Sequence, residues 1–152
     1  MIVQATWHVY VDGASRRNPG LSGAGIYAEK DGKAVIREGF FLGTRTNNEA
    51  EYLALLVGLF LLKKQVSDQE TVIIRADSEL LIKQIGGYYK VREPRLLKFH
   101  TSIKQLLEGM HAVYEHIPRE RNYRADELAN DGIDKRRPLP PAFVSLFNDI
   151  LQ

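Results

Sequence analysis

The chain has 152 residues, of which 44% are hydrophobic and 26% charged, the ordinary balance of one globular domain. This composition excludes a disordered or fibrous protein, and a formal net charge of +2 gives no strong global attraction for polyanions. Because there is no cysteine, disulfide partners, thiolate zinc sites and cysteine nucleophiles are excluded together. We expect a cytoplasmic protein without a membrane anchor, since no signal-peptide pattern begins the sequence and the longest apolar run, residues 52–62, is too short for a membrane span.

The first third of the chain predicts three antiparallel strands. Residues 7–11 are rich in β-formers and end at Asp12 and Gly13, and two further strands are expected over residues 20–28 and 34–42. The pair Asp31-Gly32 between the last two is a hairpin signal. Parallel neighbours need longer connections than these, so we expect an antiparallel meander.

Helical periodicity begins after residue 46. Apolar residues lie on nearly all sides of residues 52–62, which predicts a largely buried helix with Thr46, Asn47 and Asn48 as capping candidates. Further elements are expected as a strand over 71–76, helices over 78–85 and 94–107, a strand over 112–117 and a helix over 122–135. This order predicts an α/β fold with a mixed five-stranded sheet, in which a three-strand meander joins parallel strands and helices cover both faces.

Three prolines between residues 138 and 141 prevent the last of these helices from continuing. We therefore expect one domain over residues 1–137 and a C-terminal extension over residues 138–152. Its apolar residues recur at helical spacing: Phe143, Leu146, Phe147 and Ile150. Docking of this amphipathic segment on its own domain, which would leave a monomer, is expected in preference to a dimer or partner contact.

Four acidic residues each stand in a polar or glycine-bearing junction beside an apolar run: Asp12, Glu51, Asp77 and Asp126. We expect Asp12 to end the first strand and Asp77 to end the fourth, so both emerge at one sheet edge if these strands are adjacent and parallel. Glu51 and Asp126 lie in the opening turns of helices that can point at that edge. Taken singly, each acid is explained by turn formation, capping or the helix dipole. Taken together, they predict a site for a hard cation such as Mg²⁺.

The segments around these acids are VDGASRRNPGLSGAG, TNNEAEYLAL, ADSELLIKQI and RERNYRADELAN. They resemble the motifs of type 1 ribonuclease H, in the order and approximate spacing of that family, and the resemblance extends to about residue 135. It implies that the four acids are the catalytic carboxylates and bind two Mg²⁺ or Mn²⁺ ions. Glu49 competes with Glu51, but two residues along a helix are rotated by about 200° and cannot face the same site. The family pattern selects Glu51, and we expect Glu49 to be a solvated acid of the first turn.

The resemblance further implies an endoribonuclease that hydrolyses the RNA strand of RNA/DNA hybrids by a two-metal-ion mechanism, leaving 5′-phosphate and 3′-hydroxyl ends. Two other functions compete with this one: a non-catalytic hybrid-binding module that kept the fold, and another nuclease of the same superfamily. A pure binder would have no reason to keep four acids, because carboxylates without a cation repel phosphate. The motif strings match the type 1 group better than other nucleases.

By the same resemblance, one set of residues faces the hybrid groove, and a second set lies near its phosphates. Simple turn formation is the alternative for Asn18, and helix capping is the alternative for residues 46–48. The groove set is Gly13, Ala14, Ser15, Asn18 and Asn48, and the phosphate set is Thr46 and Asn47.

The chain departs from the family pattern in two places. Many members carry a basic, Trp-rich helical handle, but only GGYYKVREPR separates the second and third expected helices, which makes this a short form without the handle. Many members also carry a histidine loop before the last acid, where this chain has IPRERN; Glu120 or Arg119 is the auxiliary candidate, and His116 is expected to be structural. Scattered cations are either substitute phosphate contacts or a solvated face: Lys83, Lys90, Arg92, Arg95 and Lys98.

Overall fold

The computed structural model describes residues 5–152 and contains a five-stranded mixed sheet. Its strands are β1 (Thr6–Ser15), β2 (Gly20–Lys30), β3 (Lys33–Arg45), β4 (Thr71–Ala76) and β5 (His111–His116), in the spatial order β3-β2-β1-β4-β5. The first three pair antiparallel, and β4 and β5 run parallel to the central strand β1. The predicted fold class is confirmed.

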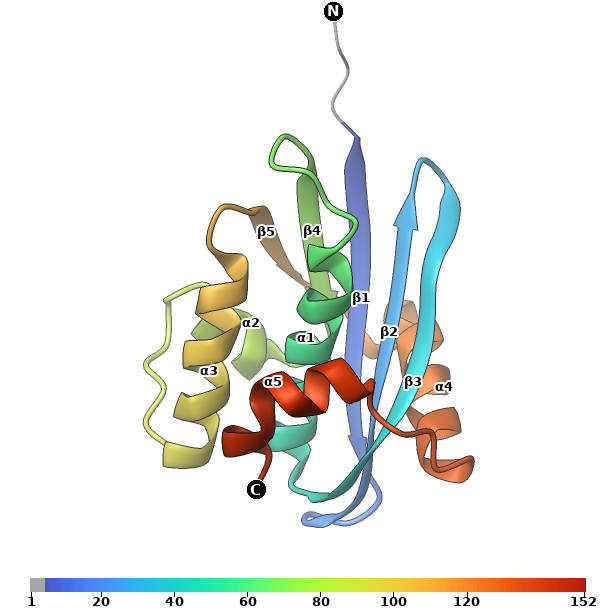
Figure 1. Ribbon diagram of the computed structural model, residues 1–152, viewed down its shortest axis with the longest axis vertical. Helices are drawn as coiled ribbons and strands as arrows, with labels where there is room; N and C mark the ends of the chain where they lie inside the picture. The colour runs from blue at the N-terminus through green and yellow to red at the C-terminus, as the bar shows by residue number, and fades with distance from the viewer. Residues whose placement is uncertain (1–4) are drawn as a thin grey trace, which may run out of the picture.

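Helices cover both faces of the sheet. They are α1 (Asn47–Lys63), α2 (Glu79–Ile85), α3 (Pro94–Leu107), the 3₁₀ turn η1 (Arg119–Asn122), α4 (Tyr123–Asp134) and α5 (Pro141–Leu151). In Figure 1, α1, α3 and α5 lie on one side of the sheet and α4 lies on the other, against β2 and β3. No helix within residues 5–152 is long and apolar enough to cross a membrane.

The strands of the meander are longer than the sequence predicted. The hairpin itself is confirmed, because Asp31 and Gly32 both take positive φ angles, 54° and 75°, as a tight primed turn requires. The expectation that Asp12 ends the first strand is wrong, since β1 continues to Ser15 and pairs with β2 beyond Asp12. An Asp-Gly pair usually ends a strand, but here a long partner strand continues the hydrogen-bond ladder past it.

Helix α1 is buried on almost every side, as predicted. Thr46 is its N-cap: the Thr46 hydroxyl accepts a hydrogen bond from the Glu49 amide at 3.1 Å, and Glu49 Oε1 accepts one from the Thr46 amide at 2.9 Å. This reciprocal capping box satisfies two backbone donors that the helix start leaves without partners. The expectation of a solvated Glu49 is therefore wrong, because the residue is only 5% exposed.

Helix α4 lies directly on the backbone of β2 and β3, because glycines leave room for it. A Cβ atom at Gly25 would lie 1.9 Å from the carbonyl oxygen of Ala125, and one at Gly39 would lie 1.9 Å from that of Leu128. No real side chain tolerates such distances. The glycines of the meander thus fix how closely the helix that carries Asp126 approaches the sheet.

Helix α5 packs its apolar face on the same side of the sheet as α1. Phe143 is fully buried, with its ring edge-on to Phe60 of α1 at a centroid distance of 5.5 Å, and Phe147 packs beside it at 4.9 Å. Near the end of α5, the Leu151 carbonyl accepts a hydrogen bond of 2.5 Å from the Arg45 guanidinium at the end of β3. These contacts add α5 to the hydrophobic core.

Candidate active site

Three of the four acids from the sequence analysis meet at one edge of the sheet. Asp12 lies on β1, Asp77 directly follows β4, and Glu51 lies in the second turn of α1. One carboxylate oxygen from each of the three lies within 4.8 Å of the other two. Asp12 and Asp77 meet because β1 and β4 are adjacent and parallel, with Tyr10 opposite Arg75 two residues before the acids.

The approach of Glu51 to Asp12 depends on a glycine. A Cβ atom at Gly13 would lie 2.1 Å from the carbonyl carbon of Ala50 and 2.3 Å from the amide nitrogen of Glu51. The main chain of β1 therefore touches the main chain of α1 at the position of the two acids. Any larger residue at Gly13 would push the helix, and Glu51 with it, away from the cluster.

Asp126 lines the same pocket but stands outside this cluster of three. It lies in the first turn of α4, and the Asn130 side chain one turn later donates to its backbone carbonyl at 3.1 Å and to its Oδ1 at 3.4 Å. The fourth acid thus reaches the site from the face of the sheet opposite α1, and it lies close enough to Asp12 to help raise the pKa of that carboxyl.

The close packing of these acids changes their ionisation. Burial, followed by the charge of Asp77, raises the pKa of Asp12 to about 8. Burial, followed by the charges of Asp12 and Asp77, raises the pKa of Glu51 well above its usual range. Glu51 Oε2 is buried without a hydrogen-bond partner. An unpartnered oxygen among crowded carboxylates fits a divalent cation, and an all-oxygen donor set suits Mg²⁺ or Mn²⁺ rather than a softer metal.

Asn122 is a buried contact of the site that the sequence analysis placed only as the first residue of a helix. Its side-chain amide donates to the Val11 carbonyl at 2.9 Å and to Asp77 Oδ2 at 3.0 Å. Nothing in the hydropathy pattern indicates this contact, because Val11 and Asp77 are distant in sequence. Its position at the end of η1, four residues before Asp126, is the only local signal.

The acids open into a pocket of about 350 Å³. Of the residues predicted to contact substrate, Gly13, Ala14, Ser15 and Asn47 line it. Three further residues that line the pocket are polar or cationic: Arg16, Arg119 and Asn130. The sequence analysis missed Arg16 and Asn130, and of its two auxiliary candidates, Glu120 and Arg119, only Arg119 lines the pocket.

The other predicted substrate residues lie outside the pocket lining. The Asn18 side chain accepts a hydrogen bond of 3.0 Å from the Asn47 amide, so it holds the start of α1 against the β1–β2 turn. Thr46 uses its hydroxyl as the helix cap, and Asn48 is exposed. Arg16, at the opposite rim, pairs with Asp134 at 2.7 Å and donates to the Asn130 side chain at 3.3 Å.

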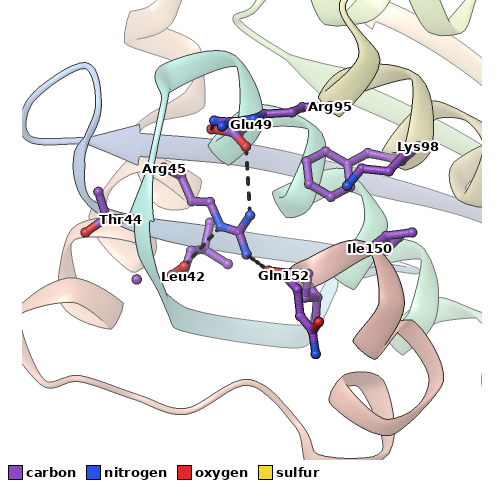
Figure 2. Close-up of a pocket in the computed structure, with 11 residues that line it drawn as sticks. Leu42, Thr44, Arg45, Glu49, Arg95, Lys98, Ile150 and Gln152 are labelled. Carbon is purple, nitrogen blue, oxygen red and sulfur yellow. Dashed lines mark hydrogen bonds and ion pairs between the residues drawn. The ribbon is translucent and has the colours of Figure 1, made fainter.

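A second pocket, of about 430 Å³, lies beyond the first turn of α1. Figure 2 shows Arg45, Arg95 and Lys98 around it, with Glu49 at one wall and the end of α5 at another. Glu49 is 3.8 Å from the Arg45 guanidinium and 3.9 Å from that of Arg95. Three cations against one buried acid, beside the N-termini of α1 and α3, make this pocket suitable for an anion.

Comparison with known proteins agrees with this geometry. Residues 10–132 match the family model described as reverse transcriptase-like. The chain is 38% identical over 131 residues to the ribonuclease HI of Halobacterium salinarum, which covers 84% of this chain and 64% of that protein. It is 30% identical over 146 residues to a ribonuclease H of Pseudomonas putida, covering 85% of this chain and 94% of that one. The chain thus spans slightly less than two thirds of the first of these relatives.

Solved structures give the same result. The crystal structure of the Halobacterium salinarum RNase H1 superposes with a TM-score of 0.80 at 37% identity, covering 86% of this chain and 98% of that chain. LC11-RNase H1, solved in complex with an RNA/DNA hybrid, superposes with a TM-score of 0.79 at 39% identity, covering 85% of this chain and 97% of that one. The matched region contains all four acids and both rims of their pocket, and the chain belongs to the type 1 ribonuclease H family.

Proposed function

We propose that this protein is a metal-dependent endoribonuclease that hydrolyses the RNA strand of RNA/DNA hybrids and leaves 5′-phosphate and 3′-hydroxyl ends. The observation that carries the proposal is the cluster of Asp12, Glu51 and Asp77, whose carboxylate oxygens lie within 4.8 Å of one another at the base of an open pocket. The relatives support the same assignment, since one is a ribonuclease HI and another was solved with a hybrid bound.

The acids of the pocket would hold two divalent cations: Asp12, Glu51, Asp77 and Asp126. When bound, Mg²⁺ or Mn²⁺ would supply activation of water and stabilisation of the leaving 3′ oxygen. The protein's own contribution is to hold buried carboxylates together, and burial followed by their mutual repulsion raises the pKa values of Asp12 and Glu51. No side-chain nucleophile is required, and Arg119 on the pocket wall offers a positive charge to the phosphate.

Recognition of RNA is assigned to the wall formed by residues 13–15 and Asn47. The Ser15 hydroxyl is already used within the protein, since the carbonyls of Arg17 and Arg45 both lie within its hydrogen-bond distance, so we assign the hybrid to those backbone groups of this segment that do not pair with β2. Backbone groups and the Asn47 amide can donate to and accept from a 2′-hydroxyl, which RNA has and DNA lacks. Asn18 then acts indirectly, by holding the Asn47 backbone.

The cationic pocket of Arg45, Arg95 and Lys98 is assigned to a backbone phosphate of the same hybrid, beyond the one that is cut. It is separated from the acidic pocket only by the first turn of α1, where Asn47 faces one side and Glu49 the other. Arg95 and Lys98 are exposed, and an ion pair of 3.9 Å with Glu49 engages the Arg95 guanidinium, whereas Arg45 is half-buried and is held by both Glu49 and the Leu151 carbonyl. This assignment gives a chain that lacks the basic handle a second phosphate-binding contact with its substrate.

We also assign the isolated chain to a monomeric state. Phe143 and Phe147 of α5, which would otherwise be open to a partner, are buried against their own domain, although Leu146 of the same segment is 63% exposed. Light scattering at the concentrations used for activity is the check, and a stable dimer would contradict the assignment.

The direct test uses labelled RNA/DNA, RNA/RNA and DNA/DNA duplexes with Mg²⁺, Mn²⁺ or a chelator. We expect only the RNA of the hybrid to be cut, only with metal, and its new ends to be extendable by a 3′-hydroxyl-dependent polymerase. The Asp77→Asn variant should fold and bind hybrid without cutting it. Intact RNA in the presence of metal would refute the nuclease, and equal cutting of all three duplexes would refute recognition through the 2′-hydroxyl.

A further inference from the structure

Asn122 has an unusual hydrogen-bond arrangement for a buried residue. The side chain is 1% exposed, and its NH₂ group donates to two acceptors, the Val11 carbonyl at 2.9 Å and Asp77 Oδ2 at 3.0 Å. The Val11 partner is a backbone carbonyl oxygen, which can only accept, so the NH₂ end of the amide must face it and Asp77 beside it. The orientation of the amide is therefore fixed by its surroundings.

The carbonyl end of the same amide has no hydrogen-bond partner within residues 5–152. Asn122 Oδ1 is buried and accepts no hydrogen bond. Burying a carbonyl oxygen without a donor is unfavourable, and an apolar side chain that only filled this space would avoid that cost. The contribution of Asn122 must therefore come from its NH₂ group and from what that group holds.

The two bonds of the NH₂ group join three segments that carry acids of the site. The Val11 carbonyl belongs to the peptide that leads into Asp12 on β1, and Asp77 follows β4. Asn122 itself is the last residue before α4, whose first turn carries Asp126. One amide thus fixes the rotation of the Asp77 carboxylate, its distance from the strand of Asp12 and the start of the helix of Asp126.

We infer that Asn122 is a positioning residue that holds the metal-binding carboxylates in their binding arrangement. The inference deepens the proposed function, because it assigns a role to Asn122 in the same site. Groups that orient metal ligands from behind typically change metal affinity or activity by about 10- to 100-fold when they are removed. Because Asn122 is buried and does not line the pocket, hybrid binding is expected to be unchanged.

The test compares Asn122→Ala and Asn122→Asp with Asn148→Ala and Asn148→Asp, matched changes at an exposed asparagine of α5. Calorimetric titration of the substrate-free protein with Mn²⁺ is expected to show affinity about 10- to 100-fold weaker for the Asn122 variants only. At saturating Mn²⁺, kcat should recover in part, and the KM for hybrid should stay within about twofold of the original protein. Unchanged Mn²⁺ affinity in a folded Asn122 variant would overturn the inference.

A measurement on the unaltered protein covers the case in which the variants do not fold. The ¹⁵N–¹H signals of the Asn122 side-chain NH₂ group are expected to shift during Mg²⁺ titration, and not to shift in the Asp77→Asn variant. Signals that stay constant would also overturn the inference. Because metal binding is read without substrate, failure of hybrid cleavage refutes the proposed function alone, while failure of these metal readouts refutes the role of Asn122 alone.

Discussion

At the scale of single residues, the two glutamates of the first turns of α1 are closely spaced but lie in different surroundings. Glu51 turns toward Asp12 and Asp77, and Glu49 closes the capping box beside Arg45. We predict that Glu51→Gln lowers kcat by at least about a hundredfold, more than the loss usual for a group that only orients a metal ligand. Steady-state cleavage of a labelled hybrid at saturating Mg²⁺ measures this.

Glu49→Gln is the matched comparison. Glutamine also serves at the third position of a capping box, and the ion pairs of the buried Glu49 are long, at 3.8 and 3.9 Å, so we expect a fall of less than about 1 kcal/mol in the free energy of unfolding. The kcat should stay within about threefold of the original. Equal losses of activity in the two variants would show that the helix register assigned to the site is wrong.

Arg119 and Glu120 form a second residue pair with different surroundings. Arg119 lines the acidic pocket and Glu120 does not. We predict that Arg119→Ala lowers kcat by about 10- to 100-fold, less than the loss of a buried oxyanion donor because Arg119 is exposed to solvent. Glu120→Ala should change kcat little, and a larger loss there than at Arg119 would contradict the assignment.

At the scale of elements, the packing of α4 on the meander depends on glycine. A Cβ atom at Gly25 would meet backbone at 1.9 Å, whereas one at Gly58 of α1 would meet only side-chain atoms of Val11 and Ile26, none closer than 3.3 Å. We predict that Gly25→Ala lowers the free energy of unfolding by about 3 kcal/mol or more, the upper range for overpacking. Gly58→Ala should change it by less than about 1 kcal/mol, since alanine favours the helix. Urea unfolding measures both.

An ion pair at the far end of the sheet sets a pH dependence. Lys30 of β2 lies 2.5 Å from Glu70, which also accepts a hydrogen bond of 2.9 Å from the Ser67 amide, and these contacts lower the pKa of Glu70 to about 2. Because the unfolded chain binds this proton more tightly, the stabilisation is present above about pH 4.5 and is lost as pH falls toward 2. We predict that Glu70→Gln is less stable at pH 7 and indistinguishable at pH 2, as thermal unfolding would report; a constant difference would contradict this.

The local sequence pattern predicts which helices and strands form. The features that it did not predict depend on contacts with residues that are distant in sequence. Helix α1 and the Asp31-Gly32 hairpin are encoded within their own residues. The burial of Glu49 was not predictable in that way, because Arg45 and Arg95 come from β3 and α3. Asn122 was missed for the same reason, since both of its partners belong to strands distant in sequence.

At the scale of the whole molecule, two pockets lie on either side of the start of α1. We assign cleavage to the acidic pocket and binding of a backbone phosphate to the cationic one. If Arg95 and Lys98 together neutralise the one phosphate assigned to their pocket, replacing both by Gln should reduce the slope of log K against log salt by about 0.9. Lys33→Gln, at the exposed hairpin far from both pockets, is the control. Hybrid binding to Asp77→Asn protein at salt concentrations between about 50 and 200 mM measures the slopes, and equal slopes would remove the second pocket from the substrate path.

The close approach of Gly13 to the first turn of α1 has a consequence for how this domain tolerates change. Where two main chains touch without a side chain between them, their separation is set by van der Waals contact between backbone atoms, which every residue type shares. Because no side chain lies in this contact, we expect repacking elsewhere in the core to leave the spacing between Asp12 and Glu51 in place. Substitutions in most of the sequence should therefore leave the spacing of the catalytic acids unchanged. A substitution at Gly13, which takes no part in the chemistry, should alter it.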